Sequence, residues 1–305
     1  MFGMNRREFV AGLAAAAAVS AVGAEAKALR VLAIGNSYTQ SLFPELPKVA
    51  AAAGVKLEFD LVARGGWTLR RHWEERASTR LEAKLKEKAW DAVVLQEQSA
   101  GGMDAANFDP WADHLVQLVR TLCPTAKLFF QLTWSDTNAA PRVYGGPGKP
   151  GTLGVDQKGM YAALEKNYTF QARRFGARLI PVGHALELYR AKLPVTFVPP
   201  TREEVAALKP GQTPDLKGEL SGFYRWGKGE GWEKDKEVMR LRIDTHHLNP
   251  EGKYLQACTW VAALFGVEMK DLAYVPDLGA DFARRAPLIR ACADESVRTF
   301  RGRGL

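Results

Sequence analysis

The sequence predicts an α/β protein in which a five-stranded parallel sheet carries helices on both faces. Five short, apolar, β-prone segments alternate with segments of helical periodicity along the chain. Strands that alternate with helices form parallel sheets, because each crossover lays a helix against the sheet. Several of these strands end in glycine-rich or polar turns, and in such sheets ligands bind beyond the carboxyl ends of the strands. The 305 residues allow one large domain or two small ones.

The elements follow one another in a regular order. Apolar runs and polar–apolar alternation predict strands, and apolar residues spaced three and four apart predict helices. The stretch 194–240 breaks this rhythm with its prolines, glycines and aromatic residues. We interpret it as an insertion into a single domain, packed over the functional face. We expect strands at 31–34, 56–62, 91–96, 127–134 and 178–182, and helices at 42–53, 70–88, 111–122, 160–175 and 254–265.

The first 28 residues, 1–28, have the pattern of a bacterial export signal. Asn5-Arg-Arg-Glu-Phe9 precedes an apolar run at 10–22, and small residues suited to cleavage follow around 24–28. The paired arginines indicate the twin-arginine route. Because the apolar run is too short to span a membrane comfortably, we expect a periplasmic protein without stable membrane insertion after signal removal. The mature domain is then 29–305.

Composition limits the classes of partner and cofactor that we expect. The formal net charge is +8, but the basic residues are spread out and not densely interleaved with aromatic residues, so we expect no nucleic-acid partner. An anionic polysaccharide or envelope surface fits the charge equally well. No Cys-x-x-Cys or His-rich spacing indicates a metal site, and we expect no metal and no cofactor. Cys123 and Cys258 lie in apolar helical patterns typical of buried thiols. One disulfide is possible, with its partners undetermined, as is the oligomeric state.

Two distant stretches carry the chemical signal. Ser37 follows the first strand in Gly35-Asn-Ser37, where a hydroxyl at a strand end is well placed as a nucleophile. Asp244 and His247 lie three residues apart in a predicted short loop that opens a helix. A carboxylate at this spacing reaches imidazole Nδ1, and Nε2 is then free to accept a proton from a serine. His246 is the competing histidine, but its spacing from Asp244 suits this role less well.

Four short motifs follow one another along the chain. They are Gly35-Asn-Ser-Tyr38, Gly65-Gly-Trp-Thr-Leu-Arg-Arg-His-Trp73, Trp90-Asp-Ala-Val-Val-Leu-Gln96 and Thr133-Trp134, followed by the Asp-x-x-His of 244–247. In this order they resemble the SGNH (GDSL-like) hydrolase superfamily, in particular a bacterial branch of it. The likeness covers the mature chain apart from 194–240 and implies a three-layer, flavodoxin-like fold and esterase-type acyl transfer.

The resemblance implies roles for individual residues. Ser37 is the expected nucleophile, His247 the general base and then acid, and Asp244 its orienting partner. The Ser37 and Gly66 N–H groups would hold the oxyanion together with a side-chain amide. The superfamily's usual Gly-x-Asn-Asp block is absent, and Gln96-Glu-Gln-Ser99 stands in its place. We therefore assign the amide to Gln96, with Gln98 as the alternative. Asn36 replaces the usual aspartate, which we expect to be tolerated because that residue supports the turn.

Trp67 and Trp134 are predicted at the rim of the site, where aromatic rings stack on sugar faces, although tryptophan is more often a core residue. The sequence thus predicts an exported serine esterase acting on small acyl esters, above all carbohydrate O-acetyl groups. Two alternatives remain. One is a lipase or lysophospholipase with 194–240 as a lid, and the other is a non-catalytic glycan-binding protein that keeps the fold.

Overall fold

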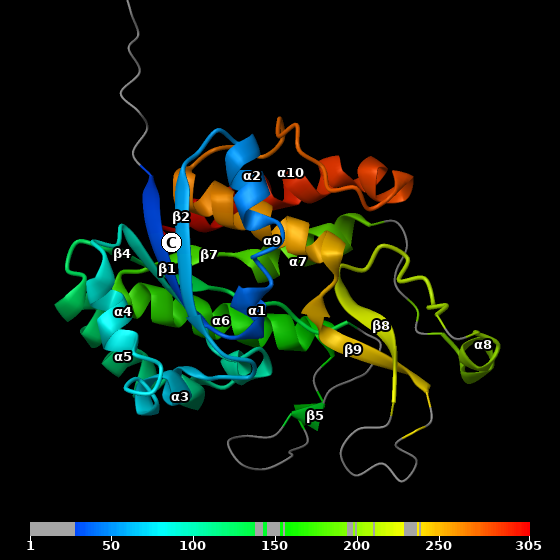
Figure 1. The fold of residues 1–305 in the computed structure, drawn as a ribbon, viewed down its shortest axis with the longest axis horizontal. Coiled ribbons are helices and arrows are strands. Elements are labelled where there is room, and N and C mark those ends of the chain that lie inside the picture. The colour runs from blue at the N-terminus through cyan, green and yellow to red at the C-terminus, as the bar shows by residue number, and fades with distance from the viewer. Residues whose placement is uncertain are drawn as a thin grey trace, which may run out of the picture.

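A computed structural model shows one parallel sheet between two layers of helices (Figure 1). The expected export signal lies outside the described residues, as do parts of the expected insertion. The described residues are 28–137, 143–144, 153–154, 156–193, 198, 200–209, 211–228, 237 and 239–305.

The main sheet has five parallel strands in the order β2-β1-β3-β4-β7. This is a flavodoxin-like order, in which the chain starts near one edge and reverses direction next to β1. The predicted parallel α/β sheet is therefore confirmed. Its strands are β1 (Leu29–Gly35), β2 (Leu57–Ala63), β3 (Ala92–Leu95), β4 (Lys127–Gln131) and β7 (Arg178–Ile180).

Strand β1 shows why helices cover both faces. Successive side chains of a strand point to opposite faces, and all of those at 31–34 are apolar and buried. Val31 and Ala33 join one core with α2, α7, α9 and α10, whereas Leu32 and Ile34 join the other with α4, α5 and α6. The longer helices are α2 (Leu46–Ala52), α4 (Leu81–Glu87), α5 (Trp111–Leu122), α6 (Gln157–Phe175), α7 (Val182–Lys192), α9 (Pro250–Phe265) and α10 (Ala280–Gly302).

Two predicted helices differ from the structure, one by a late start and one by a break. Turns occupy 41–45, so the predicted helix 42–53 begins only at Leu46, as α2, and the short helix α1 (Ser37–Gln40) precedes the turns. Pro44 accounts for the turn, because proline has no N–H to donate and disfavours helix at the residue before it. The segment 70–88 forms α3 (Leu69–Glu74) and α4, separated by turns that end at Arg80 with a φ of 55°.

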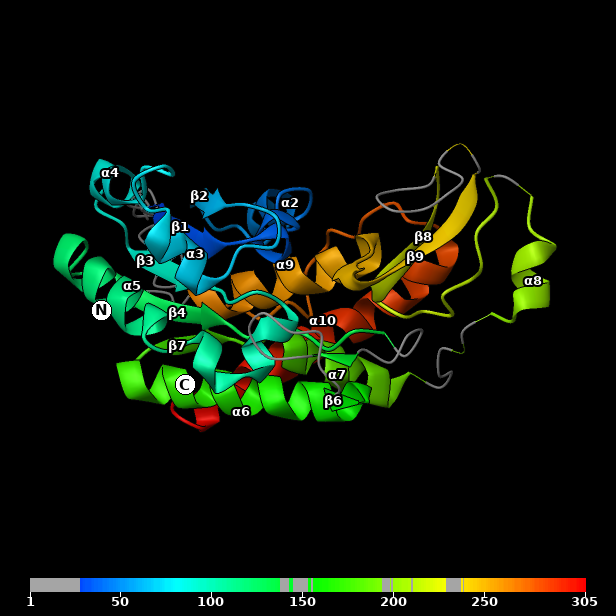
Figure 2. The same cartoon turned by 90° about the horizontal axis from the view of Figure 1, so that it is seen from below.

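The later part of the expected insertion forms a hairpin with the strand that follows it. Strand β8 (Ser221–Gly227) pairs antiparallel with β9 (Arg240–Leu248). The hairpin leads directly into α9, and so ties the stretch to the main domain (Figure 2). The remaining short elements are β5 (Val143–Tyr144), β6 (Leu153–Gly154), α8 (Arg202–Ala206), and two 3₁₀ turns at Ala100–Met103 and Ala105–Asn107.

All three cysteines are buried and free, so the disulfide that the sequence allows is not formed. Burial raises the pKa of each thiol, as expected for structural cysteines. Within the described part of the chain, no helix combines the length and apolar character needed to cross a membrane.

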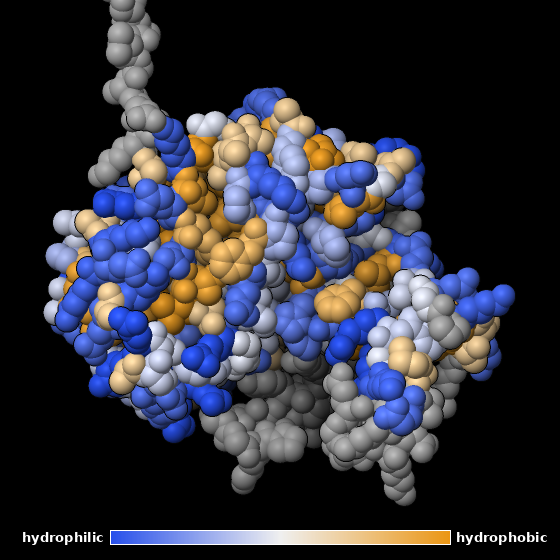
Figure 3. All heavy atoms as spheres, in the orientation of Figure 1, coloured by the Kyte–Doolittle hydropathy of each residue, from blue (hydrophilic) through white to orange (hydrophobic). Residues whose placement is uncertain are grey.

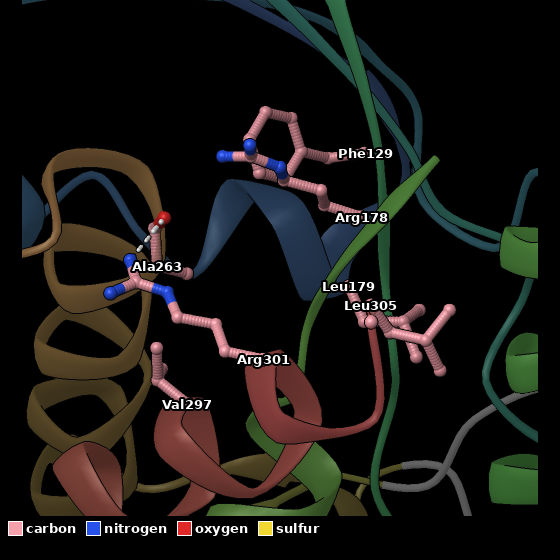
Figure 4. A pocket seen from close by; sticks show the side chains of 8 residues that line it. Phe129, Arg178, Leu179, Ala263, Val297, Arg301 and Leu305 are labelled. Atoms are coloured by element: carbon pink, nitrogen blue, oxygen red, sulfur yellow. Dashed lines mark hydrogen bonds between the residues drawn. The ribbon is translucent and has the colours of Figure 1, made fainter. Parts of the chain in front are cut away.

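A cavity of about 340 Å³ lies beside β7 (Figure 4). Arg301 lies at its wall and donates to the carbonyl oxygens of Ala262 and Ala263 at 3.0 and 3.2 Å. These carbonyls belong to the last turn of α9, where the Ala262 oxygen also accepts the N–H of the C-cap residue Gly266 at 3.0 Å. Arg301 therefore caps α9, and none of Ser37, Asp244 or His247 lines this cavity.

Candidate active site

Ser37 lies at the sharp turn between β1 and α1. Asn36 is the N-cap of this short helix, and its Oδ1 accepts the N–H of Tyr38 at 3.0 Å. The Asn36 Nδ2 donates to the Trp67 carbonyl oxygen at 2.9 Å, which joins the turn to the loop after β2. A Cβ at Gly35 would clash with the side chains of Thr39 and Gln96, so only glycine fits there. The expected supporting role of Asn36 is consistent with these bonds.

Ser37, His247 and Asp244 form a continuous hydrogen-bonded chain. His247 Nε2 lies 2.8 Å from Ser37 Oγ, and His247 Nδ1 lies 2.7 Å from Asp244 Oδ2. Because a carboxylate only accepts hydrogen bonds, Nδ1 carries the proton and Nε2 is left to accept the serine hydroxyl. The side chain of His247 is 32% exposed, so the chain of bonds is open to solvent on one side.

Asp244 and His247 lie in strand β9 and not, as the sequence suggested, in a short loop. Phe223 pairs with Asp244, whereas Ser221 pairs with Leu248, so the pairing of β8 and β9 shifts between these points. Between these two pairs lie one residue of β8, Gly222, and three residues of β9, at 245–247, which makes an enlarged β-bulge. The bulge places both side chains on one side of the strand, where a regular strand would point them to opposite faces.

Hydrogen bonds stabilise the ionised form of the Asp244 carboxylate. Burial alone would raise its pKa, but hydrogen bonds from the His247 side chain and from two backbone N–H groups hold the pKa of Asp244 well below its ordinary range. Its Oδ1 accepts the N–H groups of His246 and His247, each at 3.0 Å. The His246 ring lies close to the same carboxylate, with Nδ1 3.4 Å from Oδ1. The structure therefore brings His247, and not His246, to Ser37.

Trp134 and Trp67, which the sequence placed at a substrate-binding rim, are both buried. Trp134 is fully buried, stacks on Tyr38 with ring centroids 4.0 Å apart, and donates its Nε1–H to the His246 carbonyl at 2.8 Å. Trp67 is 8% exposed and packs edge-on against His72. The substrate-stacking prediction is wrong for both, because long-range packing covers their faces. Both tryptophans are buried residues that pack next to the site.

Gln96 does not present its amide toward Ser37, which corrects its expected role in an oxyanion hole. The side chain is 1% exposed, and its Oε1 accepts the Asn36 N–H at 3.1 Å and the Thr39 hydroxyl at 2.9 Å. Its Nε2 donates to the Glu97 carbonyl oxygen. The alternative, Gln98, is also engaged, through Ser99 Oγ and the Gly101 N–H. Gln96 therefore holds the nucleophile turn in place.

The two backbone donors expected at an oxyanion hole are free of protein partners among the described residues. The N–H of Ser37 is at the first position of α1, where a helix leaves its N–H groups unpaired. Gly66 is exposed, with a φ of 70°, in the loop that Asn36 ties to the turn. This left-handed conformation is available to glycine at little cost.

Two buried residues beside the turn were not assigned roles from the sequence. His72 Nε2 lies 2.7 Å from the Gly35 carbonyl oxygen, and burial lowers the His72 pKa to about 4. Glu97 is fully buried, and its carboxylate oxygens accept the N–H groups of Leu69 and Gln98 at 2.8 and 2.7 Å. Burial raises the pKa of Glu97 to about 8, although these two bonds act against the shift. The sequence shows His72 as part of the Gly-Gly motif, but it does not show that this side chain is buried.

Asp244, His246 and His247 also offer three donor atoms within 4.8 Å of one another, a possible metal-binding set. A metal on Nδ1 of His247 would replace its bond to Asp244, and one on Nε2 would replace its bond to Ser37. The hydrogen-bonded arrangement fits proton transfer better than metal ligation.

Comparisons with known proteins bear on the fold. No protein-family model matches the sequence, and no curated protein matches it either. Among solved structures, a DUF4886 family protein from Bacteroides uniformis aligns with a TM-score of 0.63 at 18% identity, over 89% of this chain and 95% of that one. An acetyl xylan esterase, AlAXEase, aligns with a TM-score of 0.47 at 15% identity, over 77% and 100%. A candidate SGNH hydrolase from Slackia heliotrinireducens aligns with a TM-score of 0.46 at 21% identity, over 77% and 97%. With its strand order of β2-β1-β3-β4-β7, the chain shares the three-layer α/β fold of the Bacteroides uniformis structure.

Proposed function

We propose that this protein is an exported serine esterase that hydrolyses small acyl esters, with O-acetyl groups on carbohydrate as its natural targets. The observation that carries the proposal is the chain of hydrogen bonds from Asp244 through His247 to Ser37. A serine activated by a histidine, itself oriented by a carboxylate, is the arrangement used for acyl transfer on several unrelated folds.

The geometry supports a two-step mechanism. Ser37 Oγ attacks the acyl carbonyl carbon while His247 Nε2 takes the serine proton, and Asp244 stabilises the imidazolium that forms. His247 then returns the proton to the leaving alkoxide, and the acyl group remains on Ser37. In the second step, water gives a proton to His247 and attacks the acyl carbonyl carbon. The bond from the acyl group to Ser37 Oγ then breaks, His247 returns the proton to Oγ, and the acid leaves.

The negative charge on the tetrahedral intermediate needs donors that are not already paired. The N–H groups of Ser37 and Gly66 meet this condition, whereas the amides of Gln96 and Gln98 are directed to the Glu97 carbonyl and to Ser99 Oγ. Each oxyanion donor typically contributes about 3 kcal/mol to the stabilisation of the transition state. We therefore assign the oxyanion to two backbone donors.

Export and carbohydrate substrates belong to the same proposal. The twin-arginine pattern at 5–9 supports a periplasmic location, where polysaccharides of the envelope and imported glycans occur.

The central test is hydrolysis of p-nitrophenyl acetate by the mature protein and by Ser37→Ala. The native protein should turn over and the variant should be reduced to background, and a fluorophosphonate should label only the native protein. Equal activity of the two proteins, or none in either, would contradict the assignment of Ser37. A series of p-nitrophenyl esters separates acetate preference from the lipase alternative, which predicts faster hydrolysis of octanoate.

A further inference from the structure

A basic groove runs along the free edge of the sheet and reaches Ala63, which pairs with Gly35 at the end of β1. It encloses about 730 Å³ between strand β2, the turns that follow α3, and helix α4. Among the described residues, β2 pairs only with β1, so the other edge of its backbone lies open in this part of the structure. Figure 3 shows hydrophilic residues gathered on the α4 side of the molecule, next to an apolar band over β2.

Three of the cations that line the groove have no acidic partner among the described residues. Lys84 is neutralised by Asp60 and Glu87. Arg64, Arg80 and Lys86 are exposed and form no ion pair within the described part of the chain. Most surface cations elsewhere in this region are paired, as Arg70 is with Glu74 and Arg76 with Glu82. The groove thus carries an excess of positive charge, which attracts an anionic ligand.

The groove leads to Ser37. Ala63, which lines it, pairs with Gly35, two residues before Ser37. The N–H of Arg64 points to the Gly35 carbonyl oxygen at 3.4 Å, and Gly66, the proposed oxyanion donor, is two residues further on. A chain-like ligand that lies along β2 therefore meets the nucleophile turn at the Arg64 end of the groove.

The lining favours recognition by charge over recognition by stacking. No aromatic side chain lines the groove. Trp67, the nearest candidate, is buried, and the guanidinium carbons of Arg64 and Arg71 lie 5.4 and 5.2 Å from its ring centroid. Proteins that bind single-stranded nucleic acid combine a basic groove with exposed aromatic rings on which bases stack. The open backbone edge of β2 instead offers N–H and C=O groups suited to sugar hydroxyls.

We propose that this groove binds a carboxylate-bearing polysaccharide, a polyuronate, and directs its acyl esters to Ser37. Arg64, Arg80 and Lys86 pair with successive carboxylates, and β2 receives hydroxyl groups of the same chain. This inference rests on the proposed esterase function for the purpose of the groove, but the binding itself does not require catalysis.

The test is calorimetric binding of oligogalacturonates, free of esters, to the Ser37→Ala protein, with neutral xylo-oligosaccharides of equal length as the comparison. The oligogalacturonate should bind at least about tenfold more tightly, and its affinity should fall several-fold between about 0.05 and about 0.3 M salt because the contacts are exposed. Equal affinity for the neutral ligand would overturn the proposal. So would equal or tighter binding of an oligothymidylate of matched charge, since that outcome indicates a nucleic-acid groove.

Substitutions of the groove cations test whether oligogalacturonate binds in the groove. Replacement of Arg64, Arg80 and Lys86 together by glutamine should weaken oligogalacturonate binding about tenfold, as expected for three exposed ion pairs. Arg64→Lys with Arg80→Lys keeps the charge and should bind within about threefold of the parent. A melting curve for each protein verifies that it is folded. If the triple glutamine variant is folded and binds as the parent does, the groove is not the site.

A matched control removes three unpaired, exposed cations elsewhere, at Lys127, Arg173 and Arg178. Glutamine at these positions should leave binding unchanged, and an equal loss would show a diffuse charge effect and overturn the proposal. The esterase assay with p-nitrophenyl acetate is independent of this experiment. Failure of binding with intact esterase activity rejects the groove alone, whereas binding without esterase activity rejects the catalytic proposal alone.

Discussion

The Gln96 side-chain carbonyl accepts the backbone N–H of Asn36 at 3.1 Å, so the end of β3 holds the turn that carries Ser37. The same oxygen accepts the Thr39 hydroxyl at 2.9 Å. Gln96, which the sequence resemblance placed in an oxyanion hole, thus positions the nucleophile turn, and its amide nitrogen is directed to the Glu97 carbonyl oxygen.

Gln96→Glu separates these two roles. Glutamate keeps the acceptor for Asn36 and Thr39 but loses the donor amide. If Gln96 positions the turn, kcat for p-nitrophenyl acetate should fall less than about tenfold, whereas loss of an oxyanion donor costs about 10²- to 10³-fold. Gln96→Ala, which loses the acceptor as well, should be the more damaging change. The reverse order of the two variants would restore Gln96 to the oxyanion hole.

Asp244→Asn tests the orienting carboxylate. Asparagine keeps the shape but turns an amide toward His247 Nδ1 or favours the wrong tautomer, and we expect kcat to fall about 10³- to 10⁴-fold. His246→Asn is the matched control, because His246 also lies near Asp244 but does not reach Ser37. It should reduce kcat by less than about tenfold. Similar losses in both variants would contradict the assignment of His247 as the base.

Glu97 should make the protein less stable at alkaline pH. Burial raises its pKa to about 8, from an ordinary value of 4.5 when the chain is unfolded. Between these values the folded state holds a proton that the unfolded state has lost, so stability is full below pH 4.5 and is lost as the pH rises toward 8.

Glu97→Gln removes this titration. The free energy of unfolding, measured with urea, should fall less between about pH 5 and about pH 8 in the variant than in the native protein. Glutamine presents an NH₂ group where one carboxylate oxygen accepts a backbone N–H, which costs about 1 to 3 kcal/mol at every pH. The informative quantity is therefore the slope with pH. Parallel slopes in the two proteins would show that Glu97 does not titrate in this window.

His72 should make the protein less stable at acidic pH, the opposite of the effect of Glu97. Burial lowers its pKa from 6.5 to about 4, although its bond to the Gly35 carbonyl acts against the shift. Between these values the unfolded state binds a proton that the folded state excludes, so stability is lost as the pH falls from 6.5 toward 4. His72→Gln keeps a donor for Gly35 without titrating. Its free energy of unfolding should fall less on acidification, and an unchanged slope would contradict the burial of a neutral His72.

Local patterns in the sequence were sufficient for the sheet and for three side chains of the site. The five parallel strands lie within a few residues of their expected positions, because an apolar run followed by glycine or polar residues is a local signal. The sequence patterns did not predict the turns around Pro44, before α2, or the turns before Leu81, which separate α3 from α4. Ser37, Asp244 and His247 were selected from a strand end and a three-residue spacing, and the structure brings them within hydrogen-bonding distance.

Other features were decided by tertiary structure, since burial and hydrogen-bond partners come from residues distant in the chain. Trp134 is enclosed by Tyr38 and the His246 carbonyl, 112 residues away. The Gln96 side chain forms hydrogen bonds with Glu97, at the end of its own strand, and with Asn36, 60 residues earlier. The bulge that aligns Asp244 with His247 depends on the pairing of β9 with β8. The sequence by itself therefore determined which residues stand at the strand ends, and the packing of the whole chain decided which of their atoms remain free for chemistry.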